Sequence, residues 1–186
     1  MLTLDDPRWP SLDHRGWSDG GRSRDEDAPF VPDELRHLQA NPTDRARFQV
    51  LWPYLCSEDT SWPAAYAAVP YLVAIAEGLR PADRGDYLYV VGLIVMCSGE
   101  YGHVWPGIPD DVTTAYRAAL PTALTLLTEQ LATPHGLTDT RYYLAAAAAL
   151  KGHTGLAELL NDLNFYTECQ ECGEPMIDLP DGLTLA

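Results

Sequence analysis

The stretch from Ser61 to Leu79 constrains the fold more than any other part of this sequence. Its apolar residues recur at alternating steps of four and three, at Ala65, Val69, Leu72, Ala76 and Leu79. That spacing places them on one face of an α-helix. A variant of the stretch returns about fifty residues later, over 115–127. The sequence therefore predicts an all-α fold built from copies of one helical unit.

The length and the charge of the chain limit its domain count and its partners. At 186 residues it can form one well-buried core, whereas two domains of this total size would both be poorly covered. Asp and Glu outnumber Lys and Arg by 27 to 12, a formal net charge of −15. Because nucleic-acid binding needs clustered cations, this charge argues against nucleic acid and favours a basic protein or a cation as partner.

Neither a membrane segment nor a secretory signal is predicted. The longest apolar run, from Tyr87 to Cys97, falls short of the roughly 18 residues that a membrane-spanning helix needs. The first residues, Met-Leu-Thr-Leu-Asp-Asp, lack the basic and apolar regions of a signal peptide. Four cysteines, two of them in apolar helical patterns, fit buried thiols in a reducing compartment better than a disulfide framework. We therefore expect a cytoplasmic protein.

Six long helices follow from the periodicity, after a short helix at 32–40. They are predicted at 43–56, 62–79, 82–97, 110–132, 139–151 and 155–163. The segment at 82–97 also suits a buried strand, but its helical neighbours and its charged start at Asp83-Arg84 favour a helix. Residues 1–32 have no helical or strand period, and Trp9, Trp17 and Phe30 are the side chains that could hold this arm on the body.

Three of the predicted helices carry an internal proline, at Pro53, Pro70 and Pro121. A proline removes one backbone hydrogen bond and bends a helix, as curved helical stacks require. Ala67-Ala-Val-Pro70 and Ala118-Ala-Leu-Pro121 lie 51 residues apart. That period is near the roughly 40–47 residues of HEAT and armadillo units, with an enlarged loop.

The run from Leu51 to Ala76 resembles the helix–turn–helix of bacterial HEAT-repeat proteins, in which a short polar turn precedes an Ala-Val-Pro helix. The resemblance is good over 43–97 and weaker over 110–163. It implies a HEAT-like stack of about three helical hairpins that serves protein contacts, and it supplies no catalytic residues. The alternative is a compact helical bundle. On the stack hypothesis the chain divides into an irregular N-terminal arm at 1–32, a helical domain at 33–163, and an acidic Cys-x-x-Cys hairpin with a tail at 164–186.

The most specific chemical motif is Cys169-Gln-Glu-Cys172-Gly, flanked by two possible short strands. Two thiolates at this spacing form half of a tetrahedral zinc site, which resembles one knuckle of a zinc ribbon. Because no second Cys-x-x-Cys exists, a structural hairpin without metal and a redox pair are the alternatives. If the helices alternate in direction, Cys56 and Cys97 lie at the opposite end of the stack, and His135 is the histidine at the same end as the pair.

The other end of the stack collects the polar turns. Six residues there are candidates for contacts with a partner: Glu58, Asp59, Glu100, Tyr101, His103 and Trp105. Binding residues are often placed on such loops, and the loop at 98–109 is the longest between helices. We predict non-catalytic binding of a basic protein, with a role as an inhibitor or immunity-type protein. The alternative is a metal-dependent enzyme that uses Glu58, Asp59, Glu100 and His103.

Overall fold

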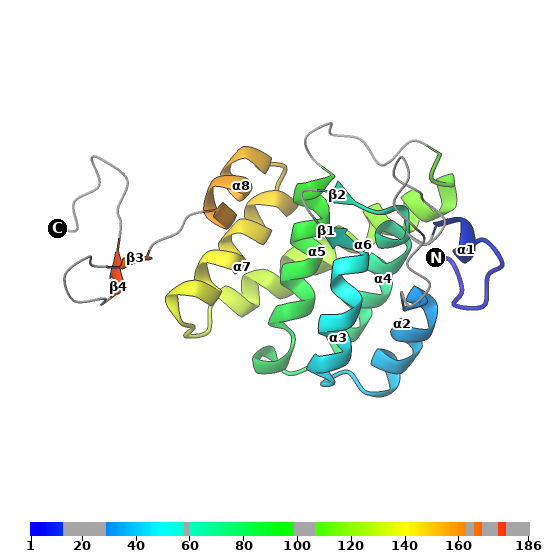
Figure 1. Cartoon of the computed structure of the whole chain (residues 1–186), viewed down its shortest axis with the longest axis horizontal. Helices are drawn as coiled ribbons and strands as arrows, with labels where there is room; N and C mark the ends of the chain where they lie inside the picture. The colour runs from blue at the N-terminus through cyan, green and yellow to red at the C-terminus, as the bar shows by residue number, and fades with distance from the viewer. Residues whose placement is uncertain (13–28, 58–59, 99–106, 163–165, 169–174, 178–186) are drawn as a thin grey trace.

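The computed structural model describes residues 1–12, 29–57, 60–98, 107–162, 166–168 and 175–177 (Figure 1). These segments are mostly helical, as predicted. The helices are α1 (Trp9–Leu12), α2 (Val31–Ala40), α3 (Arg45–Leu51), α4 (Pro63–Gly78), α5 (Gly85–Cys97), α6 (Asp110–Leu131), α7 (Leu137–Leu150) and α8 (Thr154–Asp162). Short 3₁₀ turns occupy Trp52–Tyr54 and Pro81–Asp83. The ambiguous segment at 82–97 is helical, which confirms the choice of helix over strand.

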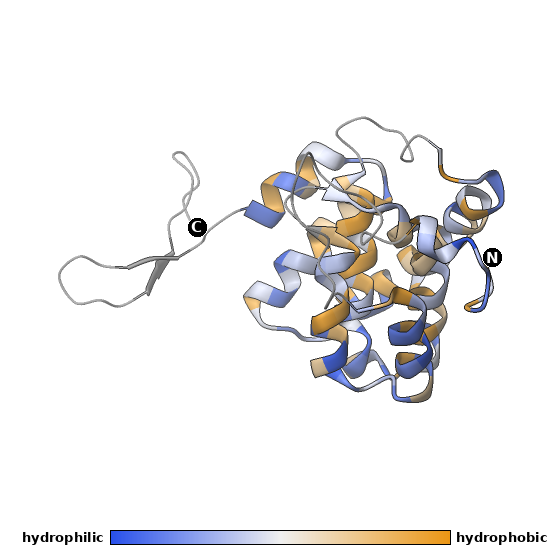
Figure 2. Ribbon diagram, turned by 45° about the vertical axis from the view of Figure 1, so that its right-hand side comes forward, coloured by the Kyte–Doolittle hydropathy of each residue, from blue (hydrophilic) through white to orange (hydrophobic). Residues whose placement is uncertain are grey.

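Helices α4 and α5 form the centre of the molecule. Twelve of the sixteen residues of α4 are buried, as expected for a helix that is apolar on most sides. Helix α4 packs against α2, α5 and α6, and α5 packs against α7. Figure 2 shows the hydrophobic residues concentrated on these inner helices. The core therefore lies between helices that are one or two positions apart in the chain.

The predicted helix at 43–56 is wrong in its extent. Helix α3 ends at Leu51, and Cys56–Ser57 instead forms strand β1, which pairs antiparallel with strand β2 (Thr60–Ser61). The physical reason is Pro53, which lacks an N–H group and whose ring would collide with the carbonyl of the preceding turn. Pro70 and Pro121, in contrast, lie inside α4 and α6 as predicted.

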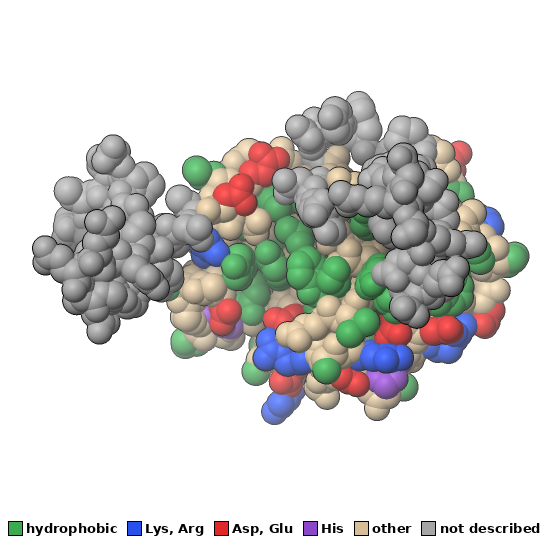
Figure 3. All heavy atoms as spheres, in the orientation of Figure 1, with side chains coloured by type: hydrophobic (Ala, Val, Ile, Leu, Met, Phe, Trp, Pro, Cys, Tyr) green, Lys and Arg blue, Asp and Glu red, His purple; other side chains and the backbone are tan. Residues whose placement is uncertain are grey.

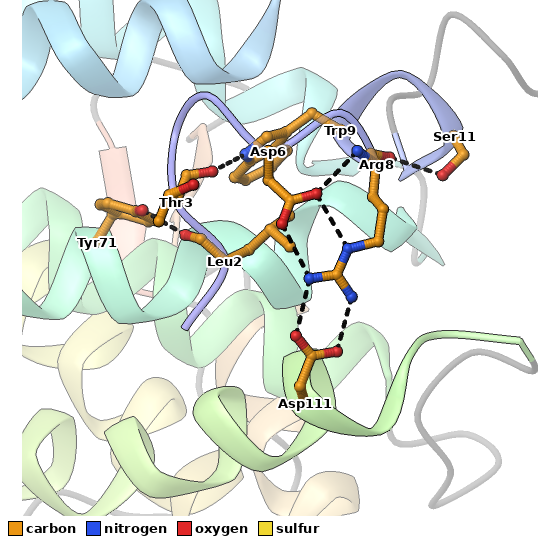
Figure 4. Close-up of polar contacts among 8 residues, drawn as sticks. All are labelled: Leu2, Thr3, Asp6, Arg8, Trp9, Ser11, Tyr71 and Asp111. Carbon is orange, nitrogen blue, oxygen red and sulfur yellow. Dashed lines mark hydrogen bonds and ion pairs between the residues drawn. The ribbon is translucent and has the colours of Figure 1, made fainter.

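The first twelve residues dock onto the helical body (Figure 4). Trp9 is fully buried, and its Nε1–H donates to the carbonyl oxygen of Thr3 at 2.8 Å. The Tyr71 hydroxyl on α4 donates to the carbonyl oxygen of Leu2. Arg8 donates two hydrogen bonds, each of 2.9 Å, to the carboxylate of Asp111 on α6. The irregular arm is thus held at its start, by Trp9 as predicted, whereas Trp17 lies outside the described residues.

Two further strands lie near the C-terminal end of the sequence. Strand β3 (Tyr166–Glu168) pairs antiparallel with strand β4 (Pro175–Ile177), with Glu168 opposite Pro175. These are the two short strands predicted around the Cys-x-x-Cys motif.

Candidate functional site

The candidate site residues from the sequence fall mainly outside the segments that the structure describes. This applies to Glu58, Asp59, Glu100, Tyr101, His103 and Trp105, and also to Cys169 and Cys172. Their arrangement therefore stays a prediction. His135 is described, and it lies at the opposite end of the helices from Cys56 and Cys97, as the alternation of helix directions predicts.

A cavity of about 620 Å³ opens at the end of the helices where His135 lies. Three turns surround it: the residues before α3, the turn between α4 and α5, and the turn between α6 and α7. Figure 3 shows acidic and basic side chains intermixed along the lower edge of the molecule, where the first two of these turns lie. The cavity is thus formed by residues from three separate parts of the chain.

Two ion pairs stand at the rim of the cavity. Arg45 Nη2 lies 2.7 Å from Asp86 Oδ2, and Arg80 Nη2 lies 2.7 Å from Asp83 Oδ2. The arginine side chains are 76% and 82% exposed, so water screens both pairs strongly. Asp139, in the first turn of α7, adds an exposed carboxylate to the rim. The rim therefore carries three carboxylates and two arginines.

Aromatic rings line the interior of the cavity. The buried Tyr87 ring packs against Phe48 with 4.4 Å between the ring centroids, and its hydroxyl donates to the carbonyl oxygen of Pro42 at 2.8 Å. Burial raises the pKa of Tyr87 to about 12, so its phenol is neutral at physiological pH. A Cβ on Gly85 would lie 2.0 Å from the Tyr143 hydroxyl oxygen. Gly85 therefore leaves the space that the Tyr143 ring occupies.

His135 is fixed by hydrogen bonds within the turn between α6 and α7. Its Nε2 lies 2.7 Å from the carbonyl oxygen of Gln130 and 2.7 Å from Oγ1 of Thr133. Because a carbonyl oxygen only accepts, Nε2 carries a hydrogen, and in the neutral ring Nδ1 is left as the unprotonated nitrogen. The ring also contacts Tyr143 edge-on at 5.0 Å. A metal ion at His135 would thus have to bind through Nδ1.

The lining of the cavity offers charged groups at its rim and aromatic groups inside it. Within the described segments, no group of three or more His, Cys, Asp or Glu side chains is placed to hold a metal ion. Each arginine of the rim forms an ion pair with a carboxylate. The tyrosines inside the cavity are neutral, can form hydrogen bonds, and have flat apolar ring faces. Such a cavity can accept a side chain that carries both a charge and an apolar stem.

One cluster of charged residues in the sequence points to this cavity. Arg80, Asp83, Arg84 and Asp86 cluster around one short turn, and the predicted helix directions bring that turn near His135. The loop at 98–109 gives the stronger sequence signal, because it is the longest between the predicted helices.

Comparisons with known proteins yield no match to the chain, whether with family models, curated sequences or solved structures. In the part of the chain that the structure covers, none of the helices combines the length and the apolar character that crossing a bilayer requires.

Proposed function

We propose that this chain is a non-catalytic protein-binding module that acts in the cytoplasm as a HEAT-like helical stack. Two features support the stack. Helix α4 packs on α6 and helix α5 packs on α7, which is the contact pattern of successive helical hairpins. The related motifs that end in Pro70 and Pro121 also occupy two helices that contact each other.

We infer that the partner is basic, and the charge distribution is the observation that carries this inference. The described segments hold fifteen acidic and nine basic residues. Six of the arginines form ion pairs with carboxylates of the same chain: Arg8, Arg36, Arg45, Arg47, Arg80 and Arg84. The chain therefore neutralises much of its own positive charge and keeps an excess of carboxylates, which attracts a cationic surface and speeds its association.

The cavity between the three turns offers a place for a basic side chain of the partner. Asp86 and Asp139 supply carboxylates, and Tyr87 and Tyr143 supply ring faces against which a guanidinium or ammonium group is stabilised. The resident Arg45 would have to move aside, which costs no more than about 1 kcal/mol for an exposed ion pair. Tight binding of a basic protein by an acidic one is how an inhibitor or immunity-type protein acts, and we propose that role here.

Affinity capture with matched charge variants tests the proposal. The full chain, Asp139→Lys and Glu158→Lys are used as baits in an extract of the source cells, and captured proteins are identified by mass spectrometry. Both substitutions change the net charge equally, but Glu158 lies on α8 and is absent from the cavity lining. We expect a basic protein that binds wild type and Glu158→Lys and binds Asp139→Lys at least about tenfold more weakly, which corresponds to about 1.4 kcal/mol.

Two results would overturn the proposal. One is a specific partner that is itself acidic. The other is a partner lost equally from both variants, since overall charge and not the cavity would then control binding. Circular dichroism measures the helix content of each variant, so that a loss of binding can be distinguished from a loss of folding.

A further inference from the structure

The thiols of Cys56 and Cys97 meet at the end of the helices opposite the cavity. Their sulfur atoms are 2.9 Å apart, although the residues are 41 positions apart in the chain. Cys56 belongs to strand β1 and is buried, whereas Cys97 is the last residue of α5 and is half-buried. We propose that these two cysteines form a dithiol site that closes to a reversible intramolecular disulfide.

The surrounding hydrogen bonds hold the two cysteines in place. Ser61, which pairs with Cys56 across the β1–β2 ladder, donates from Oγ to the carbonyl oxygen of Ile94 at 2.8 Å. The Ser98 hydroxyl donates to the same carbonyl at 2.6 Å and accepts from the Tyr66 hydroxyl at 2.9 Å. Strand β2 and helix α4 are therefore both joined by hydrogen bonds to the end of α5, next to the thiols. Closing a disulfide shortens the sulfur–sulfur distance by about 0.9 Å, to about 2.05 Å.

The exposure of the two thiols sets the order of the chemistry. The Cys97 thiolate attacks a low-molecular-weight disulfide, forms a mixed disulfide and releases one small thiolate. Cys56 then loses its proton, and its thiolate attacks the Cys97 sulfur and expels the second small thiolate, which takes up a proton. The two protein sulfurs are thereby oxidised, and the external disulfide is reduced to two thiols.

The position of Cys97 also limits how fast this site reacts. The C-terminal end of a helix carries a partial negative charge, which disfavours a thiolate there. Catalytic dithiols occupy the opposite kind of environment, at a helix N-terminus or beside cations. The pair is therefore suited to a slow oxidative cross-link that fixes β1 onto α5, and its formation accelerates as the pH rises and the thiolate fraction grows.

The test uses the folded full chain and glutathione disulfide as the probe. After incubation, remaining thiols are alkylated and the peptides are mapped by mass spectrometry. We expect a peptide that links Cys56 to Cys97, reversed by dithiothreitol, and a rate that rises between about pH 7 and pH 8.5. Since the bond closes a loop of about 40 residues, we expect the oxidised protein to melt at least about 5 °C above the reduced protein.

A Cys97→Ser variant separates this bond from one between Cys169 and Cys172, because it abolishes the linked peptide and the rise in melting temperature while leaving the second pair intact. The peptide map of the wild-type chain decides the question even if that variant folds poorly. The proposal is overturned if Cys97 stops at the mixed disulfide with glutathione. It is also overturned if both thiols stay reduced until urea unfolds the chain.

Discussion

Gly92 on α5 lies at a close contact with α7. A Cβ at this position would lie 2.2 Å from the Cβ and 2.5 Å from the Cα of Ala146 on α7. Since the Cα of Ala146 belongs to the backbone, it cannot turn away as a flexible side chain would. We expect Gly92→Ala to lower the free energy of unfolding by about 1–3 kcal/mol, as overpacking usually does, measured by urea denaturation.

Gly78 is the matched control, because a Cβ there meets nothing within 4 Å. Gly78→Ala restricts only the unfolded chain, so we expect it to be neutral or to stabilise the protein by up to about 1 kcal/mol. Equal losses at the two positions would show that the contact between α5 and α7 is less tight than the structure indicates.

The contacts of Arg8 with the carboxyl groups of Asp6 and Asp111 make the stability of the fold depend on pH. Hydrogen bonds from the Arg8 side chain hold the pKa values of Asp6 and Asp111 below their usual value. A carboxyl group with a lowered folded-state pKa stabilises the fold above its unfolded pKa of about 3.9, and this contribution is lost as the pH falls through the folded-state pKa. We therefore expect the difference in melting temperature between wild type and Asp111→Asn to narrow from pH 7 to about pH 3.

Arg8→Gln removes the arginine that donates these hydrogen bonds. In the Arg8→Gln background, Asp111→Asn should therefore change the melting temperature at pH 7 less than it does in wild type. A gap between wild type and Asp111→Asn that stays constant down to about pH 3 would contradict the assignment of the lowered pKa to this contact.

At the scale of single elements, periodicity predicted most helices, missed the short helix α1 inside the arm that was expected to be irregular, and misplaced the end of α3. The apolar face that includes Ala65, Val69 and Leu72 is buried in α4, and both Tyr66 and Tyr116 lie in the core. Pro53 was expected to bend α3, but it ends the helix instead. A single sequence cannot distinguish these outcomes, because a proline in a helix persists only where tertiary contacts compensate for the lost hydrogen bond.

The cavity was harder to predict than the helices that form it. Its lining comes from three turns that are far apart in the sequence, around Thr43, Arg80 and His135. Helix direction predicts that the last two share an end of the molecule, but their separation depends on tilts and close contacts such as that of Gly85 with Tyr143. Sequence periodicity carries no information on these tilts.

The pairing of β3 with β4 supports a metal test of the Cys-x-x-Cys motif. The two strand ends next to the motif, Glu168 and Pro175, lie opposite each other. We expect elemental analysis to find zinc at one atom per chain or per dimer, lost in the Cys169→Ser/Cys172→Ser variant. His135→Ala tests whether His135 supplies a further ligand. A metal-free wild-type protein would leave the motif a purely structural or redox element.

At the scale of the whole molecule, the charge imbalance sets how salt acts on the fold. The chain carries a formal net charge of −15, and six arginines of the described segments each form an ion pair with a carboxylate of the same chain. Self-repulsion among the remaining carboxylates disfavours the compact state, whereas the ion pairs favour it. Salt screens both effects, so the sign of its net influence shows which is larger.

We expect added salt to stabilise the protein. An exposed ion pair contributes only about 0–1 kcal/mol, and the arginines of the cavity rim are highly exposed. Acidic residues outnumber basic ones by 27 to 12, so like-charge contacts outnumber opposite-charge contacts over distances comparable to the Debye length, about 10 Å at 0.1 M salt. The melting temperature should therefore rise as NaCl increases from about 10 mM to about 300 mM, while binding of a basic partner weakens over the same range. A melting temperature that falls instead would mean that the internal ion pairs outweigh the repulsion, and would remove the excess of carboxylates as the basis for a basic partner.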